Sequence, residues 1–191
     1  MTFTKSIRGI WKFLKEDTWF SWFVSIILII AFIKLIFFPS LSFITGTSLP
    51  LVVVESCSMY HESDFEEWWQ SNRVWYESKD ISLGDFESFK FGNGLNKGDI
   101  IFVMGVGESR IGDVIIFEGK SQHPIIHRIV ELEPISTKGD HNVGHLLDGS
   151  EENIDQERLI GRAVLRIPFL GWVKLIFFEP FRSPRDRGFC K

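Results

Sequence analysis

The apolar run from Trp19 to Phe38 limits the fold of this chain more than any other feature. It reads WFSWFVSIILIIAFIKLIFF and is followed by Pro39. A helix of about 20 residues rises about 30 Å, the thickness of the hydrocarbon core of a bilayer. A cleaved signal peptide would have a shorter apolar region followed by an Ala-x-Ala site, which is absent here. The sequence therefore predicts a transmembrane helix over residues 19–38.

Charge predicts which way this helix crosses the membrane. The net charge is −4, but residues 1–40 carry +3 and the remainder −7. Basic residues collect before the span, and after Lys34 the next one is Arg73. The positive-inside rule then puts residues 1–18 in the cytoplasm, as an amphipathic segment, and residues 39–191 outside. An acidic body also argues against nucleic acid as a partner, because phosphate contact needs a basic surface.

The sequence of residues 39–191 is typical of a mainly β fold. Residues 99–103, 113–117 and 125–130 are rich in β-branched side chains and are separated by Gly, Asn, Pro and Ser. Short strands at this spacing predict a small antiparallel sheet or barrel. We interpret the apolar run over 166–178 as a final strand with an apolar edge near the membrane, because it is too short for a second span.

Residues 62–92 have a different pattern, which predicts a helical insertion in the β domain. Ser63-Asp64-Phe65-Glu66 matches a capping box, and a second short helix is expected from Ser82. The first helix carries aromatic side chains at helical spacing. We favour packing of this stripe against the β domain; the alternative is that it faces the membrane or shapes a substrate groove.

A candidate nucleophile follows the β-branched run over residues 52–54. Ser58 stands in a Ser-x-Ser-Met turn, and a serine there is a weak nucleophile unless a base takes its proton. His127, in the middle of an apolar strand, is the candidate base. His61 is too near Ser58 in sequence, and His141 and His145 have metal-ligand spacing without a matching Glu or helix. No metal site is predicted.

Two aspartates in turns, Asp140 and Asp148, are each candidates for orienting the imidazole of His127. The two cysteines, Cys57 and Cys190, are interpreted as free thiols; a disulfide to the C-terminus is the less favoured alternative.

Together these segments resemble the boxes of the type I signal peptidases, in the archaeal and endoplasmic-reticulum form. The resemblance covers roughly residues 50–175, apart from the insertion. The segments that carry it are Ser56-Cys57-Ser58-Met59, Gly98-Asp99-Ile100-Ile101-Phe102, Gly112-Asp113-Val114-Ile115-Ile116-Phe117, Ile126-His127-Arg128-Ile129-Val130, Thr137-Lys138-Gly139-Asp140-His141-Asn142 and Ile160-Gly161-Arg162-Ala163-Val164.

The resemblance implies roles for single residues. Ser58 is the implied nucleophile and His127 the general base, at the position where the bacterial form has lysine. Asp148 is implied to orient the imidazole, with Asp140 competing. The Ser56 hydroxyl and the Ser58 N–H are the implied oxyanion donors. Where the family usually has proline, two residues after Met59, this chain has His61.

We therefore expect a membrane-anchored signal peptidase I, a serine endopeptidase that removes signal peptides from exported preproteins. It would be single-pass in the cell membrane, with its catalytic domain outside, no cofactor, and an archaeal source. Its expected partners are signal peptides and the lipid bilayer, with further membrane subunits left open. One alternative is a Ser–Lys peptidase using Lys138 or Lys120. Another is a non-catalytic anchored β domain that binds a partner through the Trp-rich insertion.

Overall fold

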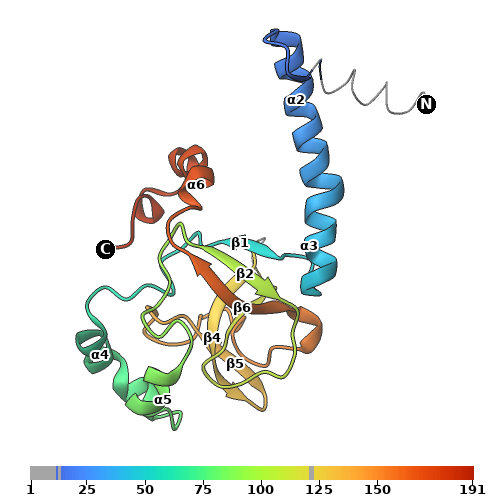
Figure 1. The fold of residues 1–191 in the computed structure, drawn as a ribbon. Helices are drawn as coiled ribbons and strands as arrows, with labels where there is room; N and C mark the ends of the chain where they lie inside the picture. Colours follow the sequence, from blue (N-terminus) through green and yellow to red (C-terminus); the bar gives the residue numbers. More distant parts are fainter. Residues whose placement is uncertain (1–11, 13, 121–122) are drawn as a thin grey trace. The chain divides into compact units, whose positions relative to one another are not determined.

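The computed structural model describes residue 12 and residues 14–120 and 123–191. The chain divides into two compact units, Met1–Ile44 and Thr45–Lys191 (Figure 1). The amphipathic segment expected over residues 1–18 lies mostly outside the described residues.

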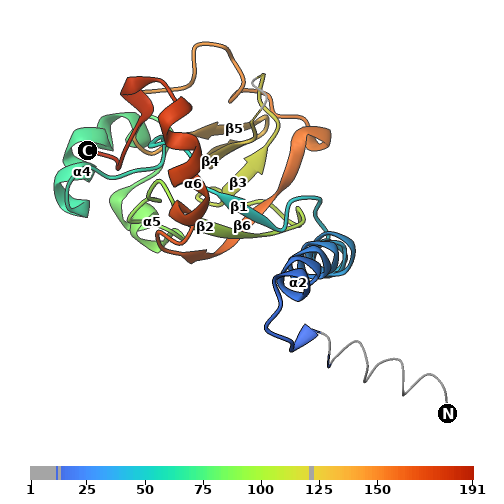
Figure 2. The same cartoon turned by 90° about the horizontal axis from the view of Figure 1, so that it is seen from above.

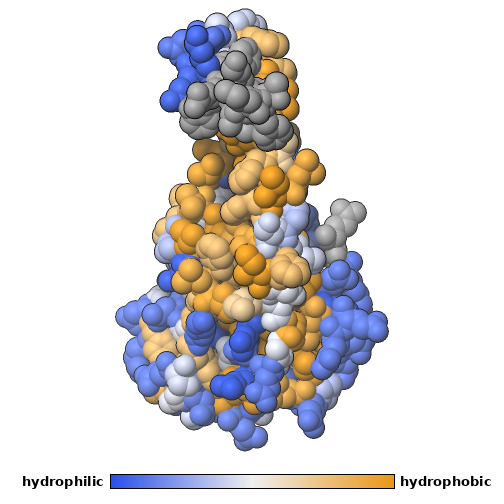
Figure 3. All heavy atoms as spheres, turned by 45° about the vertical axis from the view of Figure 1, so that its right-hand side comes forward, coloured by the Kyte–Doolittle hydropathy of each residue, from blue (hydrophilic) through white to orange (hydrophobic). Residues whose placement is uncertain are grey.

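One long helix begins at Trp19 and ends at Thr45, 27 residues in all. It consists of α2 (Trp19–Phe32), a π-helical turn (Ile33–Phe37) and α3 (Phe38–Thr45). Its large apolar side chains are exposed, and in the view of Figure 3 apolar atoms cover much of the helix surface. By length and composition it can cross a membrane.

The helix is longer than expected, because Pro39 does not end it. Pro39 is the second residue of α3. It comes directly after Phe38, whose N–H reaches back to the carbonyl of Ile33 at the end of the π-helical turn. A π turn lets the helix absorb the missing proline donor. The helix ends instead at Thr45, and Gly46 follows with a φ of 68°, which suits a glycine just beyond a helix C-terminus.

The second unit is built on a six-stranded antiparallel sheet in the order β1-β2-β6-β3-β4-β5. This confirms the predicted mainly-β fold. The strands are β1 (Leu51–Val53), β2 (Ile100–Met104), β3 (Val114–Phe117), β4 (Ile125–Leu132), β5 (Ile135–Lys138) and β6 (Leu159–Ile167).

The core lies on both faces of the central strand β3, whose four residues are all buried. Val114 and Ile116 pack in a cluster with Met59. Ile115 and Phe117 point to the other face, into a cluster with Ile129. A strand that is apolar on both faces needs cover on both sides, and this double burial fixes the neighbouring β4, which carries His127.

The insertion contains α4 (Phe65–Glu77) and α5 (Leu83–Ser88), which lie side by side in both ribbon views (Figures 1 and 2). Trp68, Trp69 and Tyr76 of α4 are buried with Phe86 of α5 and Val130 of β4. The aromatic stripe therefore packs against the β domain, as favoured.

The N-cap of one of the two helices differs from the capping box predicted from the sequence. Asp64, not Ser63, caps α4, with its carboxylate accepting from the N–H of Glu67 at 3.0 Å. Ser82 and Asp85 form a complete capping box at α5.

The C-terminal run is not a final strand beyond Ile167, which corrects the expectation for residues 166–178. Pro168 removes a ladder donor, and Phe169 takes a φ of 56°. The chain then forms α6 (Trp172–Phe178) and two 3₁₀ turns (Glu179–Phe181, Pro184–Asp186). In α6 the side chain of Leu175 is fully buried while Ile176 is exposed, so the apolar run is a one-sided helix.

Candidate active site

The turn that carries Ser58 is held at both ends. Val54 continues the pairing of β1, since its N–H donates to Asp99 at 2.9 Å and its carbonyl accepts from Gly98 at 2.8 Å. On the other side Met59 is buried, and its carbonyl accepts from Leu95 at 2.7 Å. A stiff strand and a buried side chain thus bracket the serine.

The Ser58 hydroxyl lies 3.2 Å from the hydroxyl of Ser56, the expected oxyanion partner. Ser56 is exposed and Ser58 half-buried, so both hydroxyls are at the surface of the unit. The backbone carbonyl of Ser58 accepts from the N–H of His141 at 2.9 Å. This bond ties the serine turn to the loop that follows β5.

His127 lies on β4, opposite Ile115, and is 2% exposed. Its Nδ1 is hydrogen-bonded to the carboxylate of Glu151, which is fully buried. Because an ionised carboxylate only accepts, Nδ1 carries the proton and Nε2 is left as a base. The other Glu151 oxygen accepts from the N–H of Leu146 at 2.5 Å. Sequence reasoning did not identify Glu151.

Ser58 and His127 meet at Gly139, the residue directly after β5. A methyl group built on Gly139 would lie 2.7 Å from the carbonyl oxygen of Ser58 and 2.8 Å from Nε2 of His127. It would also lie 2.7 Å from the side-chain nitrogen of Asn142. The free nitrogen of the imidazole and the backbone of the serine therefore border the same small space, which only a glycine leaves open.

Asp140 makes a different set of contacts. It is fully buried and accepts from Arg128 at 2.7 and 3.0 Å, from Tyr76 at 3.2 Å, and shares a 3.2 Å contact with His61. Burial alone would raise its pKa, but the charge of Arg128 and the hydrogen bonds from His61 and Arg128 hold the pKa well below its usual value. Asp140 is thus a fixed anion at the base of the loop.

Asp148 is exposed, and one of its oxygens accepts from the N–H of Ser150 at 2.8 Å. Hydrogen bonds from Ser150 lower the pKa of this carboxyl. No hydrogen bond or ion pair of Asp140 or Asp148 with His127 occurs in the part of the chain that the structure describes. The expected orienting acids and the carboxylate actually at the imidazole are therefore different residues.

The two lysines of the Ser–Lys alternative differ in burial. Lys138 is fully buried, donates to the carbonyl of Gly139 at 3.1 Å, and lies over the rings of Trp75 and Tyr76. Burial lowers its pKa to about 8, against the opposing effect of nearby carboxylates. Lys120 is exposed and donates to the carbonyl of Asp148.

The His141–His145 pair is not arranged as a metal site. Nδ1 of His145 lies 2.8 Å from the carbonyl of Thr137, and its ring meets Trp75 edge-on at 5.3 Å. Within residue 12 and residues 14–120 and 123–191, no group of three His, Cys, Asp or Glu side chains could hold a metal ion.

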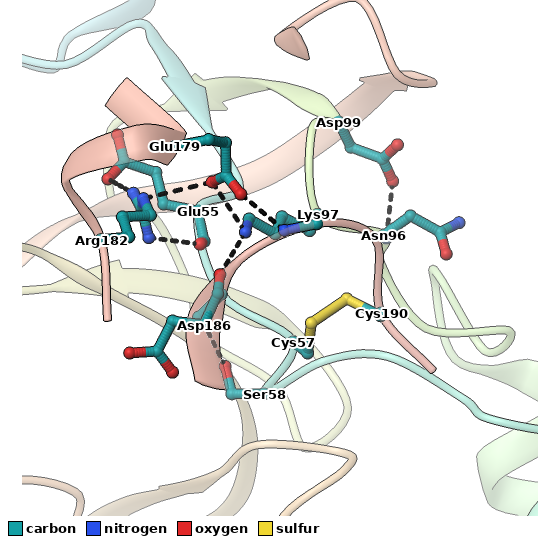
Figure 4. Close-up of a disulfide and its surroundings, with 12 residues drawn as sticks. Glu55, Cys57, Ser58, Asn96, Lys97, Asp99, Glu179, Arg182, Asp186 and Cys190 are labelled. Atoms are coloured by element: carbon teal, nitrogen blue, oxygen red, sulfur yellow. Dashed lines mark hydrogen bonds and ion pairs between the residues drawn. A yellow bond between two sulfur atoms is a disulfide. The ribbon is translucent and has the colours of Figure 1, made fainter. Parts of the chain in front are cut away.

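Cys57 and Cys190 form a disulfide, so the expectation of free thiols is wrong (Figure 4). Their Cα atoms are 5.6 Å apart although the residues are 133 positions apart in sequence. That separation explains the error: the fold of the C-terminal segment, which the sequence did not reveal, brings Cys190 to the residue beside Ser58.

A serine hydroxyl, an imidazole and a buried carboxylate are the groups of a serine-hydrolase site. No family model matches the chain. It is related in sequence to the signal peptidase complex catalytic subunits of Sclerotinia sclerotiorum and Pyricularia oryzae, at 30% and 29% identity. Each match covers 98 residues, 44% of this chain and 57% of the relative.

These relatives confirm the resemblance to the signal peptidases, although the matched part spans little more than half of their length. Both relatives come from fungi, so they give no support for an archaeal source, which stays a prediction.

Proposed function

We propose that this chain is a membrane-anchored serine endopeptidase that removes N-terminal signal peptides from exported preproteins. One observation carries the proposal: the backbone carbonyl of Ser58 and Nε2 of His127 border the same space at Gly139. The relation to signal peptidase catalytic subunits supports the substrate class.

In the proposed mechanism His127 Nε2 takes the proton of the Ser58 hydroxyl as the oxygen attacks the scissile carbonyl. Glu151 accepts the Nδ1–H and stabilises the imidazolium that forms. The imidazolium gives its proton to the leaving amine, and water then hydrolyses the acyl-enzyme with His127 again as base. The Ser56 hydroxyl and the Ser58 N–H donate to the oxyanion.

Glu151 replaces Asp148 and Asp140 as the proposed orienting residue, because it alone of the three bonds to the imidazole among the described contacts. Asp140 is instead proposed to hold the loop after β5 in place through Arg128. A buried Glu–His pair with a backbone N–H on the second carboxylate oxygen has little freedom to rotate.

The setting of the enzyme is part of the proposal. The apolar helix anchors it in the bilayer, with residues 1–18 in the cytoplasm and residues 39–191 outside, in the cell membrane or an equivalent secretory membrane. The disulfide supports this side, since such bonds persist in oxidising compartments. The names of the relatives support partner subunits in a complex.

The test uses the full chain in proteoliposomes with a preprotein substrate. Ser58→Ala and His127→Ala are expected to lower the rate of signal-peptide release at least 100-fold. Ser71→Ala, an exposed serine on α4, is the matched control and should keep the full rate. A Ser58→Ala enzyme that processes the preprotein at the wild-type rate would contradict the proposal.

The same assay distinguishes the proposed Ser–His mechanism from the Ser–Lys alternative. The lowered pKa of Lys138 is the observation that favours the alternative. Full activity in His127→Ala together with loss in Lys138→Met would favour that alternative. If no variant and no wild-type preparation releases the signal peptide, the non-catalytic β domain is favoured.

A further inference from the structure

The last residues of the chain, 179–191, form a segment that we call the C-terminal strap. Figure 4 shows it beside the turn that carries Ser58. The disulfide joins Cys190 of the strap to Cys57, the residue directly before Ser58. The strap therefore has a covalent bond one position away from the proposed nucleophile.

A second contact reaches the same turn. Arg182 donates to the carbonyl of Glu55 at 2.8 Å and to its carboxylate at 2.6 Å. Lys174 of α6 bonds the other carboxylate oxygen at 2.9 Å. Burial raises and these cations lower the pKa of Glu55, with a net lowering that keeps it ionised. The residue three positions before Ser58 is thus fixed from the same side as Cys57.

The strap is itself well anchored. Lys97 is 1% exposed and bonds Glu179 at 2.8 Å and the carbonyl of Asp186 at 2.5 Å. The ring of Phe189 packs on Trp172, with centroids 4.5 Å apart. These contacts do not involve sulfur, so we expect the strap to keep its place on the unit when the disulfide is reduced.

Burial alone does not fix the serine turn. Ser56 is exposed, and Cys57 and Ser58 are only half-buried. Its fixed points on the unit are Val54, through strand pairing, Met59, through core packing, and the Ser58 carbonyl, which accepts from the N–H of His141. The residues between them have the strap as their support on one side.

We propose that the strap is a positioning element for the Ser58 hydroxyl and that the Cys57–Cys190 disulfide is its main link. This rests on the proposed peptidase function. None of the strap residues is assigned a contact with substrate; they act by limiting the motion of the turn. A small displacement of a nucleophile from its line of attack lowers turnover strongly.

The test compares the oxidised and reduced full-length protein in proteoliposomes. Dithiothreitol supplies the two electrons and two protons that convert the disulfide into two thiols, and is itself oxidised to a cyclic disulfide. Reduction is expected to lower kcat for preprotein cleavage about tenfold or more, with a smaller change in KM. Reoxidation should restore kcat.

The double variant C57A/C190A is the matched control. Its kcat should equal that of the reduced wild type, and dithiothreitol should leave it unchanged. The rate at which a fluorophosphonate labels Ser58 should fall in parallel, while far-ultraviolet circular dichroism stays that of the folded sheet. Equal kcat in the oxidised and reduced wild type would overturn the proposal and leave the peptidase function standing. Absence of cleavage in every form is instead the failure of the peptidase function.

Arg182→Ala gives a second, independent reading if the reduced protein loses its sheet. This variant keeps the disulfide and loses the contacts with Glu55. Its kcat is expected to fall several-fold, with partial recovery in Arg182→Lys, which restores the charge. Wild-type kcat in oxidised Arg182→Ala would contradict the positioning role.

Discussion

At the scale of single residues, the candidate site depends on a glycine, Gly139, because a Cβ atom there would collide with its neighbours. Gly139 has no side chain at the point where Ser58, His127 and Asn142 approach one another. Contacts of 2.7–2.8 Å are shorter than a carbon atom tolerates, so any other residue here forces the serine backbone and the imidazole apart.

Gly139→Ala is therefore expected to lower kcat for preprotein cleavage about 100-fold, because the methyl group displaces the base from the nucleophile. Gly144→Ala is the control in the same loop, since its new methyl group would meet nothing nearer than 3.6 Å. Cleavage kinetics of both variants measure the difference. A fully active Gly139→Ala enzyme would mean that the loop moves aside at no cost.

The carboxylate behind the imidazole gives a second residue-scale prediction. Glu151→Gln keeps the shape of the side chain but removes its charge, so the imidazolium loses its partner, and kcat is expected to fall about 100-fold or more. Asp148→Asn should keep nearly the wild-type rate, because Asp148 is exposed and bonds only locally. Steady-state kinetics on the preprotein decide between them. The reverse result would return the orienting role to Asp148.

The residues of the proposed site differ in how visible they are in the sequence. Ser58 and His127 stand in short segments whose types and order are distinctive. Glu151 follows an irregular loop of uncertain length, and nothing in its neighbours marks it. Its contact with His127 depends on the backbone bond from Thr137 to the Glu151 carbonyl at 2.9 Å, which a tertiary fold alone creates.

At the scale of elements, the helical insertion is joined to the strands beneath it through Asp140. Tyr76 of α4 donates to Asp140, which also pairs with Arg128 of β4. His61 bonds Asp140 and stacks on Trp68, with ring centroids 3.7 Å apart. The histidine that replaces the expected proline thus has a function in packing: it links the segment after Ser58 to the insertion.

Breaking this link should weaken the whole unit. Asp140→Asn leaves Arg128 buried without its counter-charge, and the free energy of unfolding at pH 7 is expected to fall by about 3–5 kcal/mol. Urea unfolding in detergent, followed by tryptophan fluorescence, measures the loss. Asp155→Asn, an exposed cap residue without a side-chain cap bond, is the control. Unchanged stability in Asp140→Asn would contradict the role of the pair.

The same pair sets a pH dependence whose sign follows from Asp140. Its folded pKa lies below the ordinary value of 3.8, so the stabilisation is complete above about pH 4. As the pH falls further, the unfolded chain binds the proton first and the stabilisation is lost. The difference between wild type and Asp140→Asn should therefore shrink below pH 4. A difference that stays constant down to pH 2 would be inconsistent with this assignment.

Elements with a strong period were predictable, and those set by a local break were not. Residues 99–103, 113–117 and 125–130 appear as β2, β3 and β4 within two residues at each end, because β-branched runs have few other choices. The run over 166–178 is also apolar but contains Pro168 and Gly171. A side chain at Gly171 would collide with Val53 and with the backbone of Gly98, so this close packing needs a glycine.

At the scale of the whole molecule, the two units differ in the side chains that they expose, as expected for one unit in lipid and one in water. The helix exposes apolar side chains along its length, while the second unit has three buried apolar clusters and also exposes apolar side chains on α6. The sequence predicted the helix because an apolar run of about 20 residues matches the thickness of the hydrocarbon core of a bilayer. The disulfide was not predictable, since it needs the end of the chain to return to residue 57.

The oxidation state of Cys57 and Cys190 reports the side of the membrane on which residues 39–191 lie. Four basic residues precede the span, so the body is expected outside, where the two thiols oxidise. In cells quenched with acid, a maleimide–polyethylene glycol reagent should label neither cysteine before reduction and both after it.

Replacing Lys5, Arg8, Lys12 and Lys15 by Glu should invert part of the population and leave its cysteines free to react. Replacing Lys90 and Arg110 by Glu, far along the chain from the span, should not. Labelling of unreduced wild-type protein would place the body in a reducing compartment and refute the proposed orientation.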